Sequence, residues 1–409
     1  MRAYFYYNKA VNSSLVAFIF SSVFLFLAEI LNLISAKAGS LEFQISELSS
    51  LLISLVPYIF SYFITISLSK EDRYYRAFVM IVSLLIFSSL SGTNNILLSI
   101  IISFSANYIF NKFERIIAYI SVIIFAVILG LILFYISDYF YELLMLLASV
   151  IEKSGRLSPF LYGVFSSIFN SASISIFDEL FYFRSYGGSL IVNNEIVTGI
   201  KDMVQNGYSG KLVSSYLSGH YFQLFTLTGT ALALGEELKG SQRLAMLFTF
   251  IFAILSGDLR LCLIFLLLES HYLLFSMLLL FGGCYLVSNI LDIASPFIYN
   301  GGAVEMLFNI NNPVYLLCGG IVFTAIGFFV TKFVSLKFGL SDSFNIYIPT
   351  RLKTFVEALG GTVNIVKIEE NTAQIRNPKL INTFEIDCNI KENKVKINDE
   401  RIYELKEYL

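Results

Sequence analysis

The strongest constraint in this sequence is a succession of long apolar runs separated by short polar clusters. Hydrophobic residue types make up 56% of the 409 residues and charged types only 14%, whereas about a quarter of a soluble domain is charged. A helix needs about 20 apolar residues to cross a hydrocarbon core about 30 Å thick. We therefore expect a polytopic α-helical membrane protein, and the composition excludes a simple water-soluble fold.

The apolar stretches predict about eight to ten crossings, because several of them are short, bent or fused. Lys and Arg near helix ends mark the cytoplasmic side of a membrane protein. The best marks of that kind are Lys70, Arg73, Arg76, Lys112, Arg115, Lys332 and Lys337. The stretches are Ser14–Ala36, Leu51–Ser69, Ala77–Leu90, Ile96–Phe110, Ile116–Ile136, Leu143–Ile151, Pro159–Phe183, Leu212–Leu234, Leu244–Ser256, Cys262–Leu291 and Val314–Val334.

Net charge and motif content exclude several classes of function. The formal net charge of −2 gives no global basic field that would recruit nucleic acid. The four cysteines lack the spacing of a metal site or a disulfide framework, and we expect neither a metal nor a cofactor. The chain has no Walker motif, dinucleotide fingerprint, HExxH run or nucleophile elbow, so the nucleotide chemistry of a primary pump is not expected.

The middle of the chain interrupts the apolar pattern. Between Arg184 and Lys211 the sequence is polar and rich in Gly and Asn, and half-length apolar segments flank it on both sides. Irregular backbone at membrane depth is tolerated only where it is buried in protein or lines a water-filled cavity. The stretch therefore predicts either the lining of a substrate cavity or a long loop outside the membrane.

The composition changes again from Thr350, where charged residues become frequent. Phe355–Leu359 predicts a short helix, and the alternating segments Val363–Ile368 and Val395–Ile397 predict strands. We expect a membrane domain over residues 1–341, a linker over 342–349 and a small α+β tail over 350–409.

Several fragments, in order along the chain, carry a resemblance to a known family. They are YIFNKFERI at 108–116, Tyr162-Gly163, YLSGHYFQLFTLTG at 216–229, Gly257, and ALGG followed by Asn364-Ile365. Their order and spacing resemble the bacterial phosphotransferase sugar permeases of the glucose, N-acetylglucosamine and maltose group. The resemblance covers nearly the whole chain and implies a membrane enzyme IIC domain fused to a reduced enzyme IIB domain. It also implies a homodimer in the bacterial inner membrane, with the tail in the cytoplasm.

The resemblance also identifies positions where this chain departs from the family's pocket. The family carries Gly-Ile-Thr-Glu-Pro where this chain has Gly257-Asp258-Leu259-Arg260-Leu261, so Arg260 replaces the sugar-binding glutamate. A guanidinium only donates hydrogen bonds and keeps its charge, whereas a carboxylate accepts them. The family's His-His pair falls on Ser175 and Ile176, and its following Asn falls on Glu179. The family's Gly-Leu-Pro turn falls on Leu227, Thr228 and Gly229.

The tail lacks the residue that carries phosphate in the family. Counted from ALGG and Asn364-Ile365, the phospho-acceptor cysteine position holds Asn371. A thiolate can accept and release a phosphoryl group, but an amide cannot. Of the Arg pair that follows the cysteine in the family, only Arg376 remains, and Cys388 lies too far along the chain to substitute.

Some remaining polar residues are candidates for the interior of the membrane domain. His220 follows Ser218-Gly219 and is a candidate hydrogen-bond donor to a solute, although a satisfied structural histidine is the commoner case. Glu269 lies in a strongly apolar run and must face a cavity or a partner. We expect Glu29 and Asp292 at an interface or a helix end rather than in a proton relay. Arg260 either pairs with Asp258, Asp178 or Glu179 or lies at a helix end in contact with water.

Three hypotheses of function follow. The first is a diverged permease-like protein that does not phosphorylate sugar and acts as a sensor, scaffold or assembly partner. The second is a transporter of a sugar or an anionic solute that works without its own phosphorylation site. The third is a lipid-handling or polymer-forming membrane enzyme, for which the expected clusters of Arg, His or Asp are absent from the loops. Expected partners are membrane lipid, a second copy of the chain, a small solute or a regulatory protein, and the pocket candidates are Ser175, Glu179, His220 and Arg260.

Overall fold

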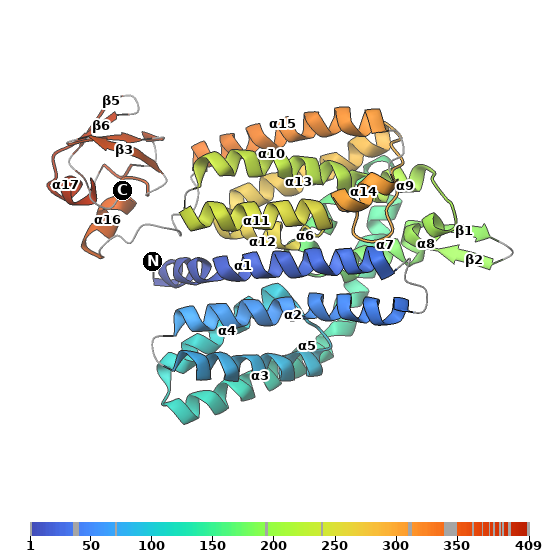
Figure 1. Ribbon diagram of the computed structural model, residues 1–409, viewed down its shortest axis with the longest axis horizontal. Coiled ribbons are helices and arrows are strands. Elements are labelled where there is room, and N and C mark those ends of the chain that lie inside the picture. Colours follow the sequence, from blue (N-terminus) through green and yellow to red (C-terminus); the bar gives the residue numbers. More distant parts are fainter. Residues whose placement is uncertain are drawn as a thin grey trace.

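A computed structural model gives the fold of the chain. It describes residues 2–35, 41–69, 72–192, 195–238, 240–309, 313–338 and 350–406, apart from 362–363, 370, 376, 379–380, 384–385, 387 and 392–393 within the last range. The predicted linker at 342–349 and Arg376 therefore lie outside the described residues. The described part is a helical membrane domain followed by a small α+β tail (Figure 1).

The membrane domain consists of long apolar helices together with several short ones. Six described helices are long and apolar enough to cross a membrane, and Ile96–Lys112 and Gln242–Ser256 are shorter apolar helices. The polytopic helical membrane fold is thus confirmed, while the number of crossings stays a prediction. The helices are α1 (Arg2–Ser35), α2 (Glu42–Leu68), α3 (Arg73–Ser91), α4 (Ile96–Lys112), α5 (Arg115–Lys153), α6 (Ser158–Ser171), α7 (Ile176–Tyr182), α8 (Ile200–Gln205), α9 (Lys211–Tyr216), α10 (Gly219–Glu237), α11 (Gly240–Ser256), α12 (Arg260–Glu269), α13 (His271–Ile290), α14 (Ala303–Asn309) and α15 (Pro313–Phe338).

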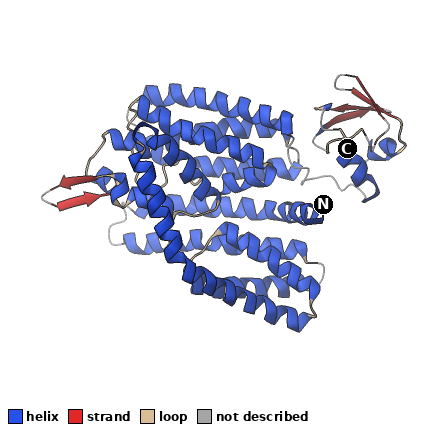
Figure 2. Ribbon diagram, turned by 180° about the vertical axis from the view of Figure 1, so that it is seen from behind, coloured by secondary structure: helices blue, strands red, loops and turns tan. Residues whose placement is uncertain are grey.

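Two groups of helices make up the membrane domain. In one group α3 and α4 pack against α5, which runs obliquely along the domain in Figure 2, and small residues such as Ala106, Ala118 and Ala126 lie between them. The other group contains α6 and α10 to α13 with α15, and α1 and α2 connect the two because α1 packs against both α2 and α11. Small residues at the contacts let helix backbones approach closely in lipid.

The predicted apolar stretches correspond to helices that are fused or broken differently. Ile116–Ile136 and Leu143–Ile151 belong to the single 39-residue helix α5. In contrast, Pro159–Phe183 is broken between α6 and α7, where Ser173 has φ +57°, and Leu212–Leu234 is broken between α9 and α10. Cys262–Leu291 is likewise divided at Ser270, whose backbone is extended. The breaks gather in the second half of the domain.

The polar stretch between Arg184 and Lys211 forms both a projecting hairpin and a cavity wall. Strands β1 (Ser189–Val192) and β2 (Glu195–Thr198) pair as an antiparallel hairpin, which extends from the end of the domain in Figure 1. Its cross-strand partners Ile191 and Ile196 are both exposed. Helix α8 follows the hairpin and returns to the interior, where Ile200 is fully buried. The stretch thus combines a projecting hairpin with a short helix that returns to the interior, and neither predicted role is tested by this arrangement.

The tail contains a four-stranded antiparallel sheet and two helices. The strands lie in the order β3-β4-β6-β5, and α16 and α17 contact one another. The helices and the alternate strand residues share one apolar core, which includes Phe355, Ala373, Val395 and Leu405. The element bounds are α16 (Thr350–Ala358), β3 (Ile365–Glu369), β4 (Thr372–Ile375), β5 (Cys388–Lys391), β6 (Lys394–Ile397) and α17 (Arg401–Lys406).

We predict that Gly229→Ala destabilises the membrane domain at the contact between α10 and α15. A Cβ at Gly229 would lie 1.9 Å from the carbonyl oxygen of Thr324, so the two backbones would have to separate. Overpacking of this kind costs about 1–3 kcal/mol, measurable as a lower thermal midpoint of the detergent-purified protein. Gly235→Ala, in the same helix, is the control, because its nearest neighbour would be Met246 Cε at 3.7 Å. Equal midpoints for the two variants would contradict the close approach.

Candidate functional site

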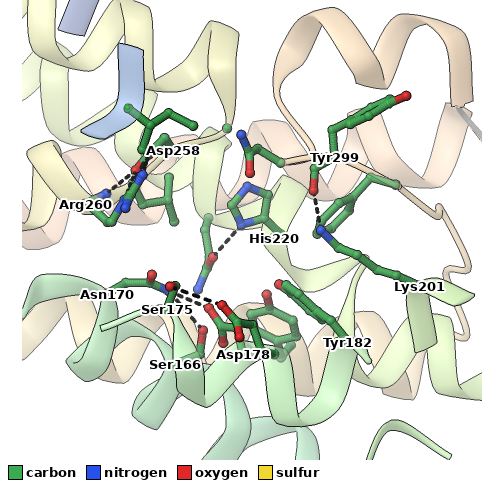
Figure 3. A pocket seen from close by; sticks show the side chains of 18 residues that line it. Ser166, Asn170, Ser175, Asp178, Tyr182, Lys201, His220, Asp258, Arg260 and Tyr299 are labelled. Atoms are coloured by element: carbon green, nitrogen blue, oxygen red, sulfur yellow. Dashed lines mark hydrogen bonds and ion pairs between the residues drawn. The ribbon is translucent and has the colours of Figure 1, made fainter. Parts of the chain in front are cut away.

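A polar cavity of ≈ 320 Å³ lies where the broken helices meet (Figure 3). Pockets of about 300–1,000 Å³ are typical of sites for small ligands. The cavity is lined from α6, α7, α8 and α10 and from two loops, which precede α12 and α14. The side chains that give it its polar character are Ser166, Asn170, Ser175, Asp178, Glu179, Tyr182, Lys201, His220, Gln223, Asp258, Arg260, Tyr299 and Asn300.

Two glycines allow the loops to cross at the cavity wall. Gly257 has φ +80°, and a Cβ there would lie 2.3 Å from the carbonyl oxygen of Asn300. A Cβ at Gly302 would lie 2.2 Å from the carbonyl oxygen of Leu255. The close backbone approach excludes a side chain at both positions, and Gly257 is in addition in the left-handed conformation that favours glycine. The crossing brings Asp258 and Asn300 to the same cavity.

A hydrogen-bond network fixes Asp178 on the wall formed by α6 and α7. Tyr162 donates its hydroxyl to Oδ1 at 3.1 Å, and Asn170 donates its amide to Oδ2 at 2.8 Å. Both carboxylate oxygens of this buried side chain therefore have a hydrogen-bond donor. On the same helix Ser175 donates its hydroxyl to Glu179 at 3.4 Å, and both of these residues are exposed.

His220 lies at the centre of the cavity in Figure 3 and is only 8% exposed. Its Nδ1 lies 3.2 Å from Oε1 of Gln223, one helical turn later, and the Gln223 amide donates to Ser167 at 3.2 Å. Its Nε2 is buried and has no hydrogen-bond partner among the described residues. A buried polar atom without a partner costs about 1–3 kcal/mol, which a bound hydroxyl would recover.

Arg260 is the first residue of α12 and pairs with Asp258, two residues earlier. Its Nε lies 3.0 and 3.1 Å from the two carboxylate oxygens, and its Nη2 lies 2.5 Å from Oδ2. Burial alone would raise the pKa of Asp258, but the charge and hydrogen bonds of Arg260 hold it below its usual value. Asp258 is thus the one of the three predicted partners that pairs with Arg260. The guanidinium is thus already neutralised and is not available as a free charge for an anion.

Lys201 supplies the second cation of the cavity from α8. Its Nζ donates to the Tyr299 carbonyl and lies 4.3 Å from the centre of the Tyr182 ring and 5.0 Å from that of Phe297. Burial lowers the pKa of Lys201 to about 8, although the charges of Glu305, Asp178 and Glu29 act in the opposite direction. The cation is therefore held by a carbonyl and two aromatic faces.

Glu305 holds the backbone of the loop that precedes α14. Its carboxylate accepts hydrogen bonds from the backbone N–H groups of Ile298 at 2.6 Å, Tyr299 at 3.1 Å and Gly301 at 2.9 Å. Three N–H donors compensate a buried anion, and they fix the Tyr299 carbonyl and Asn300 at the cavity.

The other intramembrane carboxylates lie in different surroundings. Gln242 donates its amide to Glu269 at 2.6 Å, so this carboxylate faces a partner, as predicted. Asp292 follows α13, is exposed and accepts a hydrogen bond from Ser214 at 3.3 Å, which agrees with a helix-end position. Glu29 differs from the prediction, because it is 1% exposed in the interior and accepts from the Asn300 amide at 2.6 Å.

The tail position that corresponds to the family's phospho-acceptor lies in the turn between β3 and β4. Asn371 occupies this turn, and its carbonyl accepts a hydrogen bond from the Ile397 N–H at 2.8 Å. The described residues contain no group of three or more His, Cys, Asp or Glu side chains that could hold a metal ion.

The structure brings Ser175, Glu179, His220 and Arg260 together in one cavity, although that this cavity binds a solute stays a prediction. Sequence reasoning missed Asn170, Lys201, Gln223 and Asn300 as lining residues. Lys201 lies in the polar interruption, and Gln223 lies three residues after His220, on the same face of a helix. Both could therefore have been predicted from the sequence as lining residues. Compared with known proteins, the chain matches no protein-family model and no curated protein.

A double-mutant cycle tests the pair of Asp258 and Arg260. The free energy of unfolding is measured after each residue is replaced by Ala, singly and together. The coupling energy between the two residues should lie toward the upper end of the usual 0.5–3 kcal/mol range. The reason is burial, because the side chains are only 7% and 22% exposed. The control cycle is Arg115 with Asp72, whose side chains are 56% and 33% exposed. That pair should couple by about 1 kcal/mol or less, and similar values for both cycles would contradict a strong pair at the cavity.

Proposed function

We propose that this chain is a diverged, permease-like membrane protein that binds a small neutral, hydroxylated solute in the cavity and carries it across the membrane without phosphorylating it. The observation that carries the proposal is the cavity itself, open among broken helices and lined by polar groups from six parts of the chain. Discontinuous helices near the bilayer midplane are the usual place for a transporter's substrate site. The open cavity favours a solute-binding role over a purely structural one.

The side chains of the cavity favour a neutral solute over an anionic one. Arg260 is paired with Asp258, and Lys201 lies among the negative charges of Glu305 and Asp178. An anion would have to compete with these carboxylates. A sugar-like hydroxyl can both donate to Asp178 or Glu179 and accept from an amide, so it can satisfy donors and acceptors of the wall together.

The proposal also includes the side of the membrane on which the tail lies and the contacts of the domain with lipid or a second copy of the chain. Basic residues at the start of α3 and α5 and at the ends of α4 and α15 gather at the end of the domain beside the tail in Figure 1. The bias toward Lys and Arg supports a cytoplasmic tail in a bacterial inner membrane. The row Ile120, Ile124, Ile128 and Leu131 of α5 is exposed and apolar, which suits membrane lipid or a second copy of the chain.

A second candidate function is that of a membrane sensor. The tail keeps an apolar core and a complete four-stranded sheet among its described residues, although Asn371 stands at the phospho-acceptor position. A folded domain without a thiol at that position is suited to a contact with a regulatory or structural partner. Solute binding without transport would favour this role.

We predict that His220→Ala weakens binding of the solute by about 10- to 100-fold, because loss of a buried hydrogen bond costs about 1–3 kcal/mol. The measurement is equilibrium binding and uptake of radiolabelled glucose, N-acetylglucosamine and maltose by the full chain in proteoliposomes. His271→Ala is the matched control, since His271 is the only other histidine and is not among the residues that line the cavity. Equal binding by both variants, or no binding of any sugar by the wild type, would contradict the proposal.

We also predict that the chain takes no phosphoryl group from the general phosphotransferase proteins. The reason is the amide of Asn371, which cannot act as a nucleophile and leaving group in the way that a thiolate does. The measurement is incubation with labelled phosphoenolpyruvate and those proteins. The control is Asn371→Cys, which restores the thiol at the same turn. A stable label on the wild-type chain would overturn the absence of phosphotransfer.

A further inference from the structure

Glu29 is a membrane-embedded carboxylate with few partners. It lies in the candidate span Leu15–Ser35 of α1 and is 1% exposed. Its Oε2 accepts from the Asn300 amide at 2.6 Å, and its Oε1 is buried without a hydrogen-bond partner among the described residues. Carboxylates inside membrane domains are rare, because a charged side chain at the bilayer centre costs several kcal/mol.

The charges around Glu29 do not compensate an anion at this position. The charged groups that act on it are Glu305 from α14 and Lys201 from α8. Close by, α2 contributes Ser49, which donates its hydroxyl to a carbonyl of α1, and α11 contributes Phe252, which contacts α1. The Glu305 carboxylate accepts hydrogen bonds from three backbone N–H groups, and Lys201 can balance only one anion. An ionised Glu29 would leave this group of three with a net charge of −1.

Glu29 is nevertheless connected to the cavity through Asn300. Asn300 lines the cavity and donates its amide to the carboxylate. The preceding residue, Tyr299, accepts from Lys201 through its carbonyl and donates its N–H to Glu305. Glu29, Lys201 and Glu305 therefore all act on the same short segment of cavity wall. A change in the charge of one of them changes the hydrogen bonds that Asn300 and Lys201 can donate to a solute.

We propose that Glu29 is a proton-binding site and that its protonation is coupled to binding of the solute in the cavity, so that a proton and a solute cross together. This inference rests on the proposed function. An ionised Glu29 holds the Asn300 amide in a charge-assisted hydrogen bond. When Glu29 takes up a proton, that hydrogen bond weakens and the net charge of Glu29, Glu305 and Lys201 together changes from −1 to zero. The Asn300 amide is then released to donate to a solute hydroxyl. By reciprocity a bound solute favours the protonated carboxyl.

A proton is a suitable driving ion for this chain in particular. The tail has Asn371 in place of a phosphoryl-carrying thiol, so accumulation of solute needs another source of free energy. One pH unit corresponds to about 1.4 kcal/mol, which supports up to about tenfold accumulation if one proton crosses with each solute molecule.

The test uses the full chain in proteoliposomes with an interior one pH unit more alkaline than the outside and with potassium and valinomycin holding the membrane potential at zero. Wild-type protein should accumulate whichever of radiolabelled glucose, N-acetylglucosamine or maltose it carries, up to about tenfold. Glu29→Gln, which keeps an acceptor for Asn300, should equilibrate the sugar without accumulation. Glu269→Gln is the control for loss of an intramembrane carboxylate outside the cavity, and it should accumulate like the wild type.

The outcomes separate this inference from the proposed function. Wild-type uptake that ignores the pH gradient, or accumulation by Glu29→Gln equal to wild type, overturns proton coupling and leaves solute carriage intact. Failure to move any of the three sugars under either condition removes the proposed function instead. Infrared difference spectra between wild type and Glu29→Gln, recorded without a solute, then show whether Glu29 is protonated. A carboxylic-acid band at neutral pH that disappears in alkali is expected, and a carboxylate band at neutral pH overturns the site.

Discussion

The lack of water in the hydrocarbon core is the constraint on which the rest of this structure depends. Backbone groups that leave a helix within a membrane domain need partners inside the protein. Glu305 provides them for the loop before α14 by accepting three backbone N–H groups, and Gly257 and Gly302 let the crossing loops approach without side chains. The cavity exists because these contacts hold irregular backbone at fixed positions, so that polar side chains face an open space rather than lipid.

The same constraint explains the way in which charges are distributed around the cavity. Arg260 has Asp258, Asp178 has Tyr162 and Asn170, and Lys201 has a carbonyl and two rings. Each of these charges thus already has partners within the protein. Breaking a matched buried pair costs more than making it contributes, so a neutral solute that bonds to the remaining donors and acceptors is favoured over an ion that must displace a partner.

Much of the fold could be predicted from the sequence, because long apolar runs and alternating strands are local patterns. The helical membrane class followed from the apolar runs, and the strands predicted near 363–368 and 395–397 overlap β3 and β6. The hairpin at 189–198 was missed, although two β-branched segments flank an Asn-Asn pair, which is a hairpin signal. The candidate site needed tertiary proximity, which one sequence does not contain. No local pattern places Glu29 next to Asn300, because 271 positions separate them.

The absence of a phosphoryl-carrying thiol at Asn371 in the tail affects how solute movement through the cavity could be driven. In the family that this chain resembles, the tail's thiolate joins the phosphate supply to the sugar. Asn371 stands at that position in this chain, and an amide does not relay a phosphoryl group. Under the proposed function the tail therefore acts on the cavity through conformational change. The proposed solute carrier then draws on ionisable groups of its own membrane domain. Glu29 is buried beside the cavity wall and has one carboxylate oxygen without a hydrogen-bond partner in the described structure. The protonation of Glu29 is therefore the step at which, under the proposed coupling, a proton gradient acts on the solute.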